Sequence, residues 1–395
     1  MFIKRILIYF PILLILFLAQ SFFWVPTYDE QALGNPERLK KYIRASSGDA
    51  ETLNPLISAD TASSSINSLV FDGLIALDDK LEYRPRLATS WTQSEEAFLV
   101  VDPRYRLEKI EKKLPNSMDW LHYIKKLLEK TPQGIGNLKS IDLVPGLVVE
   151  GSVQVPISGR NGSPEELQGR SLMQPIFYTL RYPDRIKFTL NHIDQDFFNP
   201  IKKWIGEEYF EKFPYDDFIS AKKKSQYNLL KTNFAKILPL TEHNPIISFN
   251  LRRGVRFHDG HEFDSGDVLF TYRSIMNVKT ASPRRSDYEP VKHALADGPY
   301  KAIITYKRLF SSAINSWSMG ILPEHLLNEE ALNKEALVNK NDSKKFNIRD
   351  SQFNRKPIGT GPFRFAEWRS DEIIRLERND DYWEGPPEYQ EYIMR

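Results

Sequence analysis

The chain of 395 residues contains no cysteine. This absence excludes disulfide bonds, catalysis by a thiolate, zinc sites built from cysteine and a bacterial lipid anchor on cysteine. It fits an oxidising compartment, although many cytosolic chains also lack cysteine. At this length the core buries enough apolar surface to fold without disulfides or a structural metal.

A surplus of charge of one sign is also missing. Lys and Arg together number 54 and Asp and Glu number 52, so the formal net charge is +2. Such a balance gives no basis for binding nucleic acid or an acidic substrate. The hydrophobic share of 41% and the charged share of 27% are ordinary for globular proteins, and the length suits two or three domains.

Motifs of catalysis and nucleotide binding are absent as well. No Gly-x-Ser-x-Gly sequence occurs. Gly359-Thr360-Gly361 resembles the start of a dinucleotide loop, but Arg364 stands where the third glycine belongs. The segment that follows is typical of a strand, whereas that loop requires a helix. We therefore interpret these glycines as a turn.

Two histidines, His258 and His261, lie near several carboxylates and suggest a metal site. Their His-x-x-His-Glu order differs from the helical His-Glu-x-x-His spacing of zinc enzymes, and the segment does not match a calcium loop. The pattern favours a polar hairpin turn, followed by a helix from Asp267 that Asp264 or Ser265 caps. The sequence thus predicts no catalytic residue, no metal and no cofactor.

The N-terminus carries an export pattern. Lys4 and Arg5 precede an almost unbroken apolar run over residues 6–25. Small residues at Ala19 and Ser21 suit cleavage by a signal peptidase. The run is equally long enough to remain as an uncleaved membrane anchor, with the two basic residues on the cytoplasmic side. Both alternatives place residues from Thr27 onward outside the cytoplasmic membrane.

Hydrophobic periodicity predicts a mixture of helices and strands. Helices are expected over residues 60–74 and 267–276, and strands over 42–45, 74–77, 247–251, 359–368 and 373–378. Residues 96–245 differ in texture. They contain basic amphipathic stretches at 105–113 and 120–130, a valine-rich region at 141–157, and two strand-like runs, 177–181 and 185–190. Tyr182-Pro183-Asp184 joins those two runs, which indicates a hairpin.

An ordered set of short motifs carries the analysis further. They are Thr52-Leu53-Asn54-Pro55, Phe71-Asp72-Gly73-Leu74, Pro85-Arg86-Leu87-Ala88-Thr89-Ser90-Trp91, Phe249-Asn250-Leu251-Arg252-Arg253-Gly254-Val255-Arg256-Phe257-His258-Asp259-Gly260, Asp267-Val268, Ile321-Leu322-Pro323-Glu324-His325, Gly359-Thr360-Gly361-Pro362-Phe363 and Leu376-Glu377-Arg378-Asn379 with Tyr382-Trp383. Together they resemble the family-5 extracellular solute-binding proteins of ABC importers, which handle oligopeptides, dipeptides, nickel complexes and some sugars. The resemblance covers about residues 42–91 and 246–395.

The resemblance implies an α/β fold: a periplasmic-binding-protein-like (type II) first lobe with a mixed sheet and flanking helices, its second lobe largely missing. It implies four parts, namely a signal peptide or anchor at 1–25, a core sheet at 42–65 with 352–395, a subdomain at 66–96 with 246–351, and an insertion at 97–245 that is atypical of the family. We expect the insertion to fold by itself, and we assign it no function.

The resemblance also implies a binding function without catalysis. Two lobes would close around a peptide or similar small solute and present it to permease subunits in the membrane. Ser58, Asp60, Thr61 and Tyr288 stand where the family's first lobe approaches its ligand, although capping of the following helix explains Asp60 equally well. The protein would be periplasmic or otherwise extracytoplasmic, with residues 6–25 as a possible anchor in the inner membrane. The alternative is a binding or scaffold module that no longer transports, and a hydrolase is disfavoured because no nucleophile motif occurs.

Overall fold

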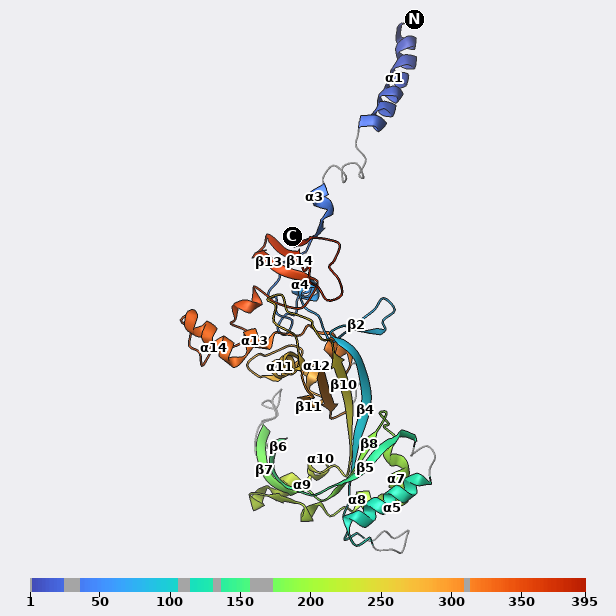
Figure 1. Ribbon diagram of the computed structural model, residues 1–395, viewed down its shortest axis with the longest axis vertical. Coiled ribbons are helices and arrows are strands. Elements are labelled where there is room, and N and C mark those ends of the chain that lie inside the picture. Colours follow the sequence, from blue (N-terminus) through green and yellow to red (C-terminus); the bar gives the residue numbers. More distant parts are fainter. Residues whose placement is uncertain (1, 25–35, 106–113, 131–135, 157–172, 309–312) are drawn as a thin grey trace, which may run out of the picture.

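The computed structural model describes residues 2–24, 36–105, 114–130, 136–156, 173–308 and 313–395. The N-terminal helix α1 (Phe2–Trp24) stands apart from the rest of the chain (Figure 1). Its side chains are described between Tyr9 and Gln20, and the large apolar ones there are exposed. Within the described ranges, no helix is long and apolar enough to cross a membrane.

The remaining elements are a mixture of strands and helices. The strands are β1 (Lys41–Arg44), β2 (Ile75–Leu77), β3 (Tyr83–Pro85), β4 (Ala88–Val100), β5 (Leu138–Val144), β6 (Val148–Pro156), β7 (Met173–Arg181), β8 (Arg185–Leu190), β9 (Ile219–Ala221), β10 (Thr241–Leu251), β11 (Val291–Ala296), β12 (Lys301–Tyr306), β13 (Phe363–Arg369), β14 (Ile373–Arg378) and β15 (Glu391–Met394). The α-helices after α1 are α3 (Pro36–Leu39), α4 (Thr61–Val70), α5 (Ser117–Glu129), α7 (Phe198–Ile205), α8 (Glu207–Glu211), α9 (Tyr227–Lys231), α10 (Phe234–Ile237), α11 (Ser265–Met276), α12 (Arg285–Tyr288), α13 (Glu324–Leu327) and α14 (Glu329–Val338). Short 3-10 turns are η2 (Tyr215–Asp217), η3 (Lys224–Gln226), η4 (Asn315–Ser318) and η5 (Gln352–Asn354).

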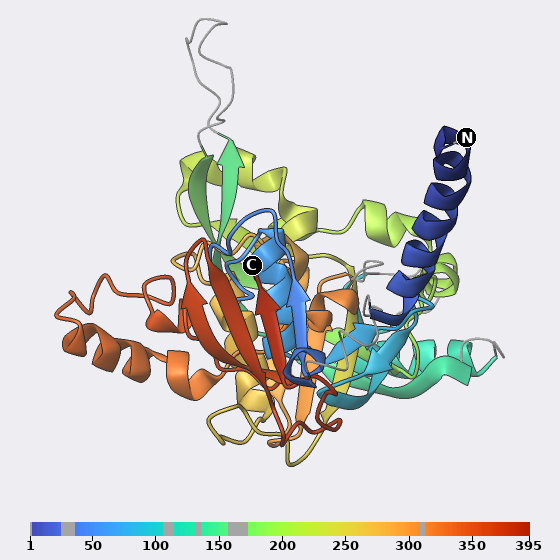
Figure 2. The same cartoon turned by 90° about the horizontal axis from the view of Figure 1, so that it is seen from above.

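A mixed sheet has the strand order β1-β15-β14-β13. It brings β1, from the N-terminal part of the sequence, beside strands from the C-terminal part. The pair β1–β15 is parallel, and the other two pairs are antiparallel. Helix α4 lies beside this sheet (Figure 2). The predicted mixed sheet with flanking helices is thus confirmed.

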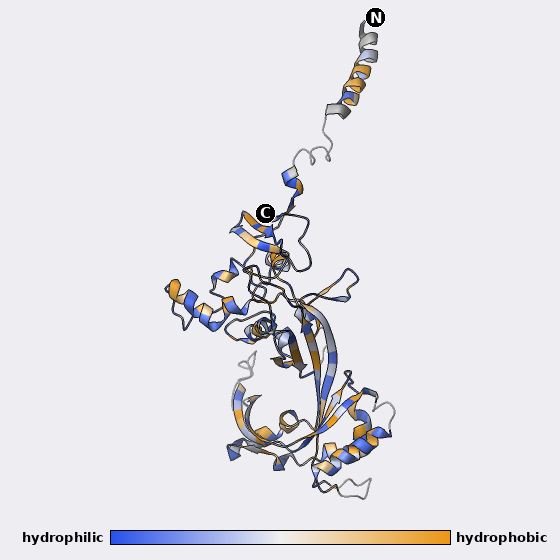
Figure 3. Cartoon of the chain, in the orientation of Figure 1, coloured by the Kyte–Doolittle hydropathy of each residue, from blue (hydrophilic) through white to orange (hydrophobic). Residues whose placement is uncertain are grey.

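A second sheet of six strands runs through the length of the body, in the order β11-β12-β10-β4-β8-β5. Its two longest strands, β4 and β10, pair in antiparallel fashion from Ala88–Leu251 at one end to Leu99–Thr241 at the other. Along β10 the buried Ile247, Phe249 and Leu251 alternate with Ser248 and Asn250, as expected for a strand with one buried face; Figure 3 colours both strands by hydropathy.

Among the described residues, buried apolar side chains form two separate clusters. One draws on residues 50–88 and 247–394, and the other draws on residues 97–240. β4 contributes to both clusters, and β10, which pairs with β4 along its length, contributes to the first, so the two strands connect the two parts without a break (Figure 1). The predicted boundaries at 97 and 245 fall between the clusters, and the division into domains remains a prediction.

The predicted hairpin over 177–181 and 185–190 is wrong. β7 pairs with β6 and β9 in a separate three-stranded sheet, whereas β8 pairs with β4 and β5. Tyr182 and Asp184 lead the chain from one sheet to the other. The Tyr182 N–H donates to the Leu147 carbonyl at 2.7 Å, and Asp184 Oδ1 accepts from the Gly146 N–H at 2.7 Å. The predicted amphipathic stretch at 105–113 lies almost wholly outside the described residues.

Helix α4 illustrates how local sequence sets one element. Asp60 caps its start, because Asp60 Oδ1 accepts from the Ser63 N–H at 2.7 Å. Ile66 and Val70 turn toward the core and are fully buried. The helix ends against the glycine turn: the Gly361 N–H donates to the Val70 carbonyl at 2.9 Å. A Cβ on Gly361 would lie 2.5 Å from the Leu69 carbonyl oxygen, so a glycine is required by close packing.

Asp72, just after α4, forms a buried polar centre. Its carboxylate accepts from Trp383 Nε1 at 2.9 Å, Tyr382 Oη at 3.2 Å and Thr360 Oγ1 at 3.3 Å, and it pairs with Arg86. These partners come from three of the motifs noted above, and Asp72 itself belongs to a fourth. Their common contact with Asp72 explains why motifs so far apart in the chain occur together.

Candidate functional site

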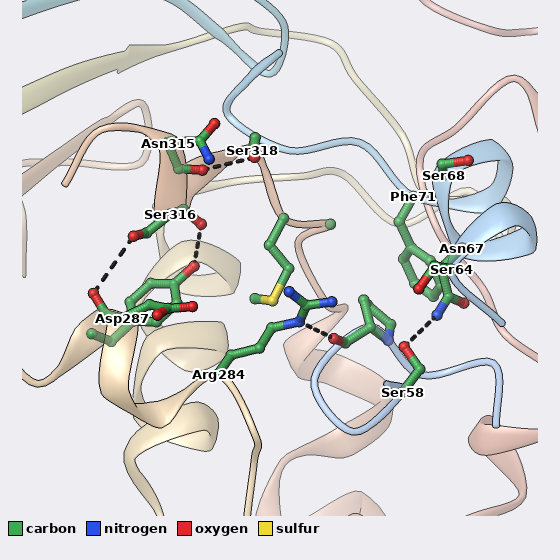
Figure 4. A pocket seen from close by; sticks show the side chains of 14 residues that line it. Ser58, Ser64, Asn67, Ser68, Phe71, Arg284, Asp287, Asn315, Ser316 and Ser318 are labelled. Carbon is green, nitrogen blue, oxygen red and sulfur yellow. Dashed lines mark hydrogen bonds between the residues drawn. The ribbon is translucent and has the colours of Figure 1, made fainter. Parts of the chain in front are cut away.

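A cavity of about 460 Å³ lies between α4, α12 and η4 (Figure 4). Its walls are mostly small hydroxyl and amide side chains, with one cation and one anion. The lining residues are Pro55, Ser58, Ser64, Asn67, Ser68, Phe71, Arg284, Asp287, Tyr288, Asn315, Ser316, Ser318, Met319 and Gly320.

One wall is formed by α4 and the loop before it. Asn54, which is fully buried, folds that loop by accepting from the Leu56 N–H at 3.0 Å through its side chain. The loop carries Ser58 toward α4, where Asn67 Nδ2 donates to Ser58 Oγ at 3.0 Å. Asn67 is 6% exposed, and its Oδ1 has no hydrogen-bond partner among the described residues. This wall therefore contains a buried acceptor.

The facing wall carries the two charges. Arg284 lies just before α12 and is half-buried, and its Nε donates to the Pro55 carbonyl at 3.0 Å. The guanidinium thus extends toward the loop of the first wall (Figure 4). Asp287 is exposed one turn later. In the part of the chain that the structure describes, neither Arg284 nor Asp287 belongs to an ion pair.

Tyr288 closes the back of the cavity with its ring. The ring contacts Trp317 edge to face at a centroid distance of 5.4 Å, and the hydroxyl donates to the Ser316 carbonyl. Burial raises the pKa of this hydroxyl well above its ordinary value. Tyr288 therefore contributes apolar surface and stays neutral.

The structure brings two of the four sequence-predicted residues, Ser58 and Tyr288, to this cavity. Asp60 caps α4 instead, and Thr61 is exposed in the first turn of α4, outside the cavity lining. The ligand roles of all four remain predictions.

Asn67 and Arg284 are among the lining residues that sequence reasoning did not single out. Asn67 had a signal, because it is an amide within the apolar stripe of a predicted helix. Arg284 had none, since it follows a proline in a loop without periodicity.

The turn that carries His258 and His261 is organised by a backbone bridge and by hydrogen bonds to neighbouring elements. An isolated bridge between Arg256 and Glu262 forms the predicted hairpin turn, and Asp264 caps α11 through a capping box. His258 contacts the Gly361 carbonyl through Nε2 at 2.9 Å. Burial lowers the pKa of His258 to about 4, which keeps the ring neutral. No group of three potential metal ligands occurs among the described residues.

Comparison with protein families places this cavity in context. Residues 241–395 match the model of the bacterial extracellular solute-binding proteins, family 5 Middle. The match begins at Thr241, the first residue of β10, and includes the Arg284 wall and η4.

Three curated relatives match part of the chain. The oligopeptide-binding protein AppA of Bacillus subtilis (strain 168) is 35% identical over 142 residues, 35% of this chain and 23% of the relative. Protein XP55 of Streptomyces lividans is 29% identical over 166 residues, 42% of this chain and 28% of the relative. Di/tripeptide-binding protein 2 of Pseudomonas aeruginosa (strain UCBPP-PA14) is 26% identical over 161 residues, 38% of this chain and 29% of the relative. The chain thus spans about a quarter of the length of these relatives.

Two solved structures overlap more of the chain at lower identity. NikZ from Campylobacter jejuni in complex with Ni(L-His) covers 90% of this chain, with 39% of its own length aligned, 16% identity and a TM-score of 0.44. AppA from Bacillus subtilis in complex with a nonapeptide covers 90% of this chain, with 39% of its own length aligned, 19% identity and a TM-score of 0.43.

Proposed function

We propose that this chain is an extracytoplasmic substrate-binding component of an ABC transporter that captures peptides for import, because residues 241–395 match the model of the bacterial extracellular solute-binding proteins, family 5 Middle. Curated relatives bear names of oligopeptide- and di/tripeptide-binding proteins. The observation that carries the proposal is the cavity, one wall of which lies inside the family segment.

The chemistry of the cavity suits a peptide. Arg284 and Asp287 offer one positive and one negative group, which match the two ends of a zwitterion. The hydroxyls of Ser58, Ser64 and Ser68 can hold water, and bridging water lets one site accept different side chains. The proposal assigns no catalytic step to any residue.

The direct test is a thermal-unfolding screen of the full chain against di-, tri- and oligopeptides, nickel chelates and sugars. A ligand that binds the native state raises the midpoint, with about 2.7 kcal/mol of stabilisation at a hundredfold excess over Kd. We expect the shift with peptides. A shift confined to nickel chelates or sugars, or no shift from a folded sample, would refute peptide capture.

A matched pair of variants locates the site. Ser68 and Thr61 are both exposed on α4, but only Ser68 lines the cavity. We expect Ser68→Trp to fill the cavity and abolish the peptide-induced shift, while Thr61→Trp keeps it. The opposite result would move the site to the segment around Thr61, as the sequence resemblance implies.

We also propose that residues 6–25 direct export, so that the chain acts outside the cytoplasmic membrane and meets permease subunits there. Lys4 and Arg5 before the apolar run support this orientation. External protease added to spheroplasts should digest the chain. Protection until the cells are lysed would contradict export.

A further inference from the structure

Strand β6 lies at one edge of the three-stranded sheet β6-β7-β9, and among the described residues it pairs with β7 alone (Figure 1). The Lys222 N–H, just after β9, donates to the Phe177 carbonyl at 3.1 Å, so odd-numbered residues of β7 direct their backbone groups toward β9. Even-numbered residues of β7 bond to odd-numbered residues of β6. The even-numbered residues of β6 therefore direct their backbone groups away from the sheet.

The backbone groups of Val148, Glu150, Ser152 and Gln154 thus line an edge with which no described strand pairs. Natural sheets protect such edges with proline, lysine or inward-pointing charges. The opposite edge follows this rule, because Pro175 of β7 has no N–H to present beyond the end of β9. The β6 edge has a single charge, on Glu150, and no proline before its last residue.

Apolar side chains beside this edge are exposed on both faces of the sheet. Val148 is 66% exposed, and the next residue, Val149, which faces the other way, is 38% exposed. Phe177 of β7 is 51% exposed. The Tyr178 ring lies across β6 at Gly151, where a Cβ would come within 2.6 Å of Tyr178 Cζ. Free backbone groups and uncovered apolar surface together form a template for another strand.

We propose that β6 pairs with β6 of a second copy of this chain, in antiparallel register about a two-fold axis at Ser152. This register sets Glu150 opposite the partner's Gln154, whose amide N–H groups are suitable donors to a carboxylate. On the other face, Val149 meets the partner's Val155. A two-fold axis at Glu150 would instead set two carboxylates against each other, which is destabilising.

The charge of the edge favours a second copy over a charged partner. Glu150 already forms an ion pair with Lys222 of its own chain at 2.7 Å, so the edge presents no net charge. Its remaining polar groups are satisfied by a copy of the same strand. One strand buries less than the standard interface of about 1,600 Å², so we expect a reversible dimer with a Kd of about 1–100 μM.

The absence of cysteine from the chain permits a direct test by cross-linking. The full chain is kept in detergent, which covers the exposed apolar side chains of α1. Opposite residues of a hydrogen-bonded pair have Cα atoms about 5.5 Å apart, a distance that a disulfide spans. Ser152→Cys should therefore form a disulfide-linked dimer on mild oxidation. Ser220→Cys, exposed on β9 at the other edge of the sheet, is the matched control and should remain monomeric.

Two further variants test the register. Glu150→Cys and Gln154→Cys should each give little disulfide-linked dimer alone, because each residue lies far from its own copy across the axis. Mixed together, the two variants should cross-link with one another. A mixture of Glu150→Cys with Ser152→Cys that cross-links instead would overturn the proposed two-fold axis.

Sedimentation of the unoxidised chain over a range of concentrations measures the reversible association. Ser152→Lys places two like charges at the axis and should weaken association by about fivefold or more. Ser220→Lys should leave it unchanged. An equimolar mixture of Ser152→Lys and Ser152→Asp should restore it, which a general loss of stability cannot do. The thermal midpoint of each variant shows whether it folds.

Equal cross-linking of Ser152→Cys and Ser220→Cys would overturn the inference. So would a dimer that Ser152→Lys leaves intact, because the copies would then associate through another surface, such as α1. A chain that stays monomeric well above the expected Kd would also overturn it. Slower hydrogen exchange of the β6 amides when a peptide is added to such a monomer would assign the edge to an extended peptide. The thermal-unfolding screen for peptide capture is independent of all these outcomes.

Discussion

Replacing Asp72 by Asn should destabilise the fold strongly, because Asp72 holds together parts of the chain that are far apart in sequence. The Asp72 side chain is fully buried and pairs with Arg86, whose side chain is 14% exposed. Burial alone lowers the pKa of Arg86, but attraction and hydrogen bonding to Asp72 outweigh it, so the pKa is raised. An amide of the same shape keeps the packing and removes the charge.

The size of the effect follows from the partners that remain. Removing one member of a buried ion pair costs about 3–5 kcal/mol, because the other charge stays buried. Arg86 keeps a second bond, to Glu384 at 2.9 Å, so the lower end, about 3 kcal/mol, applies. Tyr382→Phe removes a neutral hydroxyl that donates to Asp72 and accepts from Arg86 Nη2 at 2.7 Å. Because both bonds join charged groups, it should cost about 2 kcal/mol, less than the loss of the ion pair.

Urea unfolding of the full chain and of each variant measures these costs. A double-mutant cycle with Arg86→Met isolates the pair, and we expect the double variant to be more stable than the sum of the single losses predicts. A loss below about 1 kcal/mol for Asp72→Asn, or strictly additive losses in the cycle, would refute the view that this ion pair joins the motifs.

Three further predictions concern single residues. The pKa of His258 is lowered to about 4 from an ordinary 6.5, so the unfolded chain binds this proton first as the pH falls, and the stability that the neutral ring provides is lost between pH 6.5 and 4. The unfolding free energy of the unmodified chain minus that of His258→Gln should therefore fall by about 2 kcal/mol from pH 7 to pH 4.5. A constant difference would contradict a neutral buried ring. Asp60→Ala should cost about 1 kcal/mol in urea unfolding through loss of the α4 cap and leave peptide affinity unchanged; weaker peptide binding at unchanged stability would instead support the ligand role predicted from the sequence. Gly361→Ala should cost more than about 2 kcal/mol, because its Cβ would lie 2.5 Å from the Leu69 carbonyl oxygen, and a near-neutral result would mean that the end of α4 moves aside freely.

Most individual elements could be predicted from the sequence, because periodicity and capping act locally. The helix of α11 follows from its apolar spacing and from Asp264, and the strand β10 from its alternation. The pairing of strands could not be predicted in this way. β7 and β8 are joined by a turn signal, yet β7 pairs with β9 some 40 residues onward, and no local pattern encodes that choice.

The candidate site could be predicted only in part, because its residues meet only in the folded chain. Ser58 and Tyr288 were expected from motif resemblance and lie in one cavity. Thr61 stands within one turn of helix from the lining residue Ser64, but it points elsewhere, and sequence proximity cannot resolve the direction of a side chain. Arg284 becomes significant only because its Nε meets the Pro55 carbonyl across more than 200 residues, a contact that exists only in the folded chain.

The unbroken pairing of β4 with β10 bears on how this protein can be redesigned. Ser94 of β4 and Ile246 of β10 face each other, with one core on either side of them along the strands. The pair is therefore a natural graft point: two chain ends already lie in register there and can be closed by a two-residue Asn-Gly turn. An odd change in length on one strand would exchange inward and outward side chains beyond the graft, whereas an even change would keep them. The 151 residues between these positions could thus be exchanged as a cassette, with the parity of the joint as the rule for success.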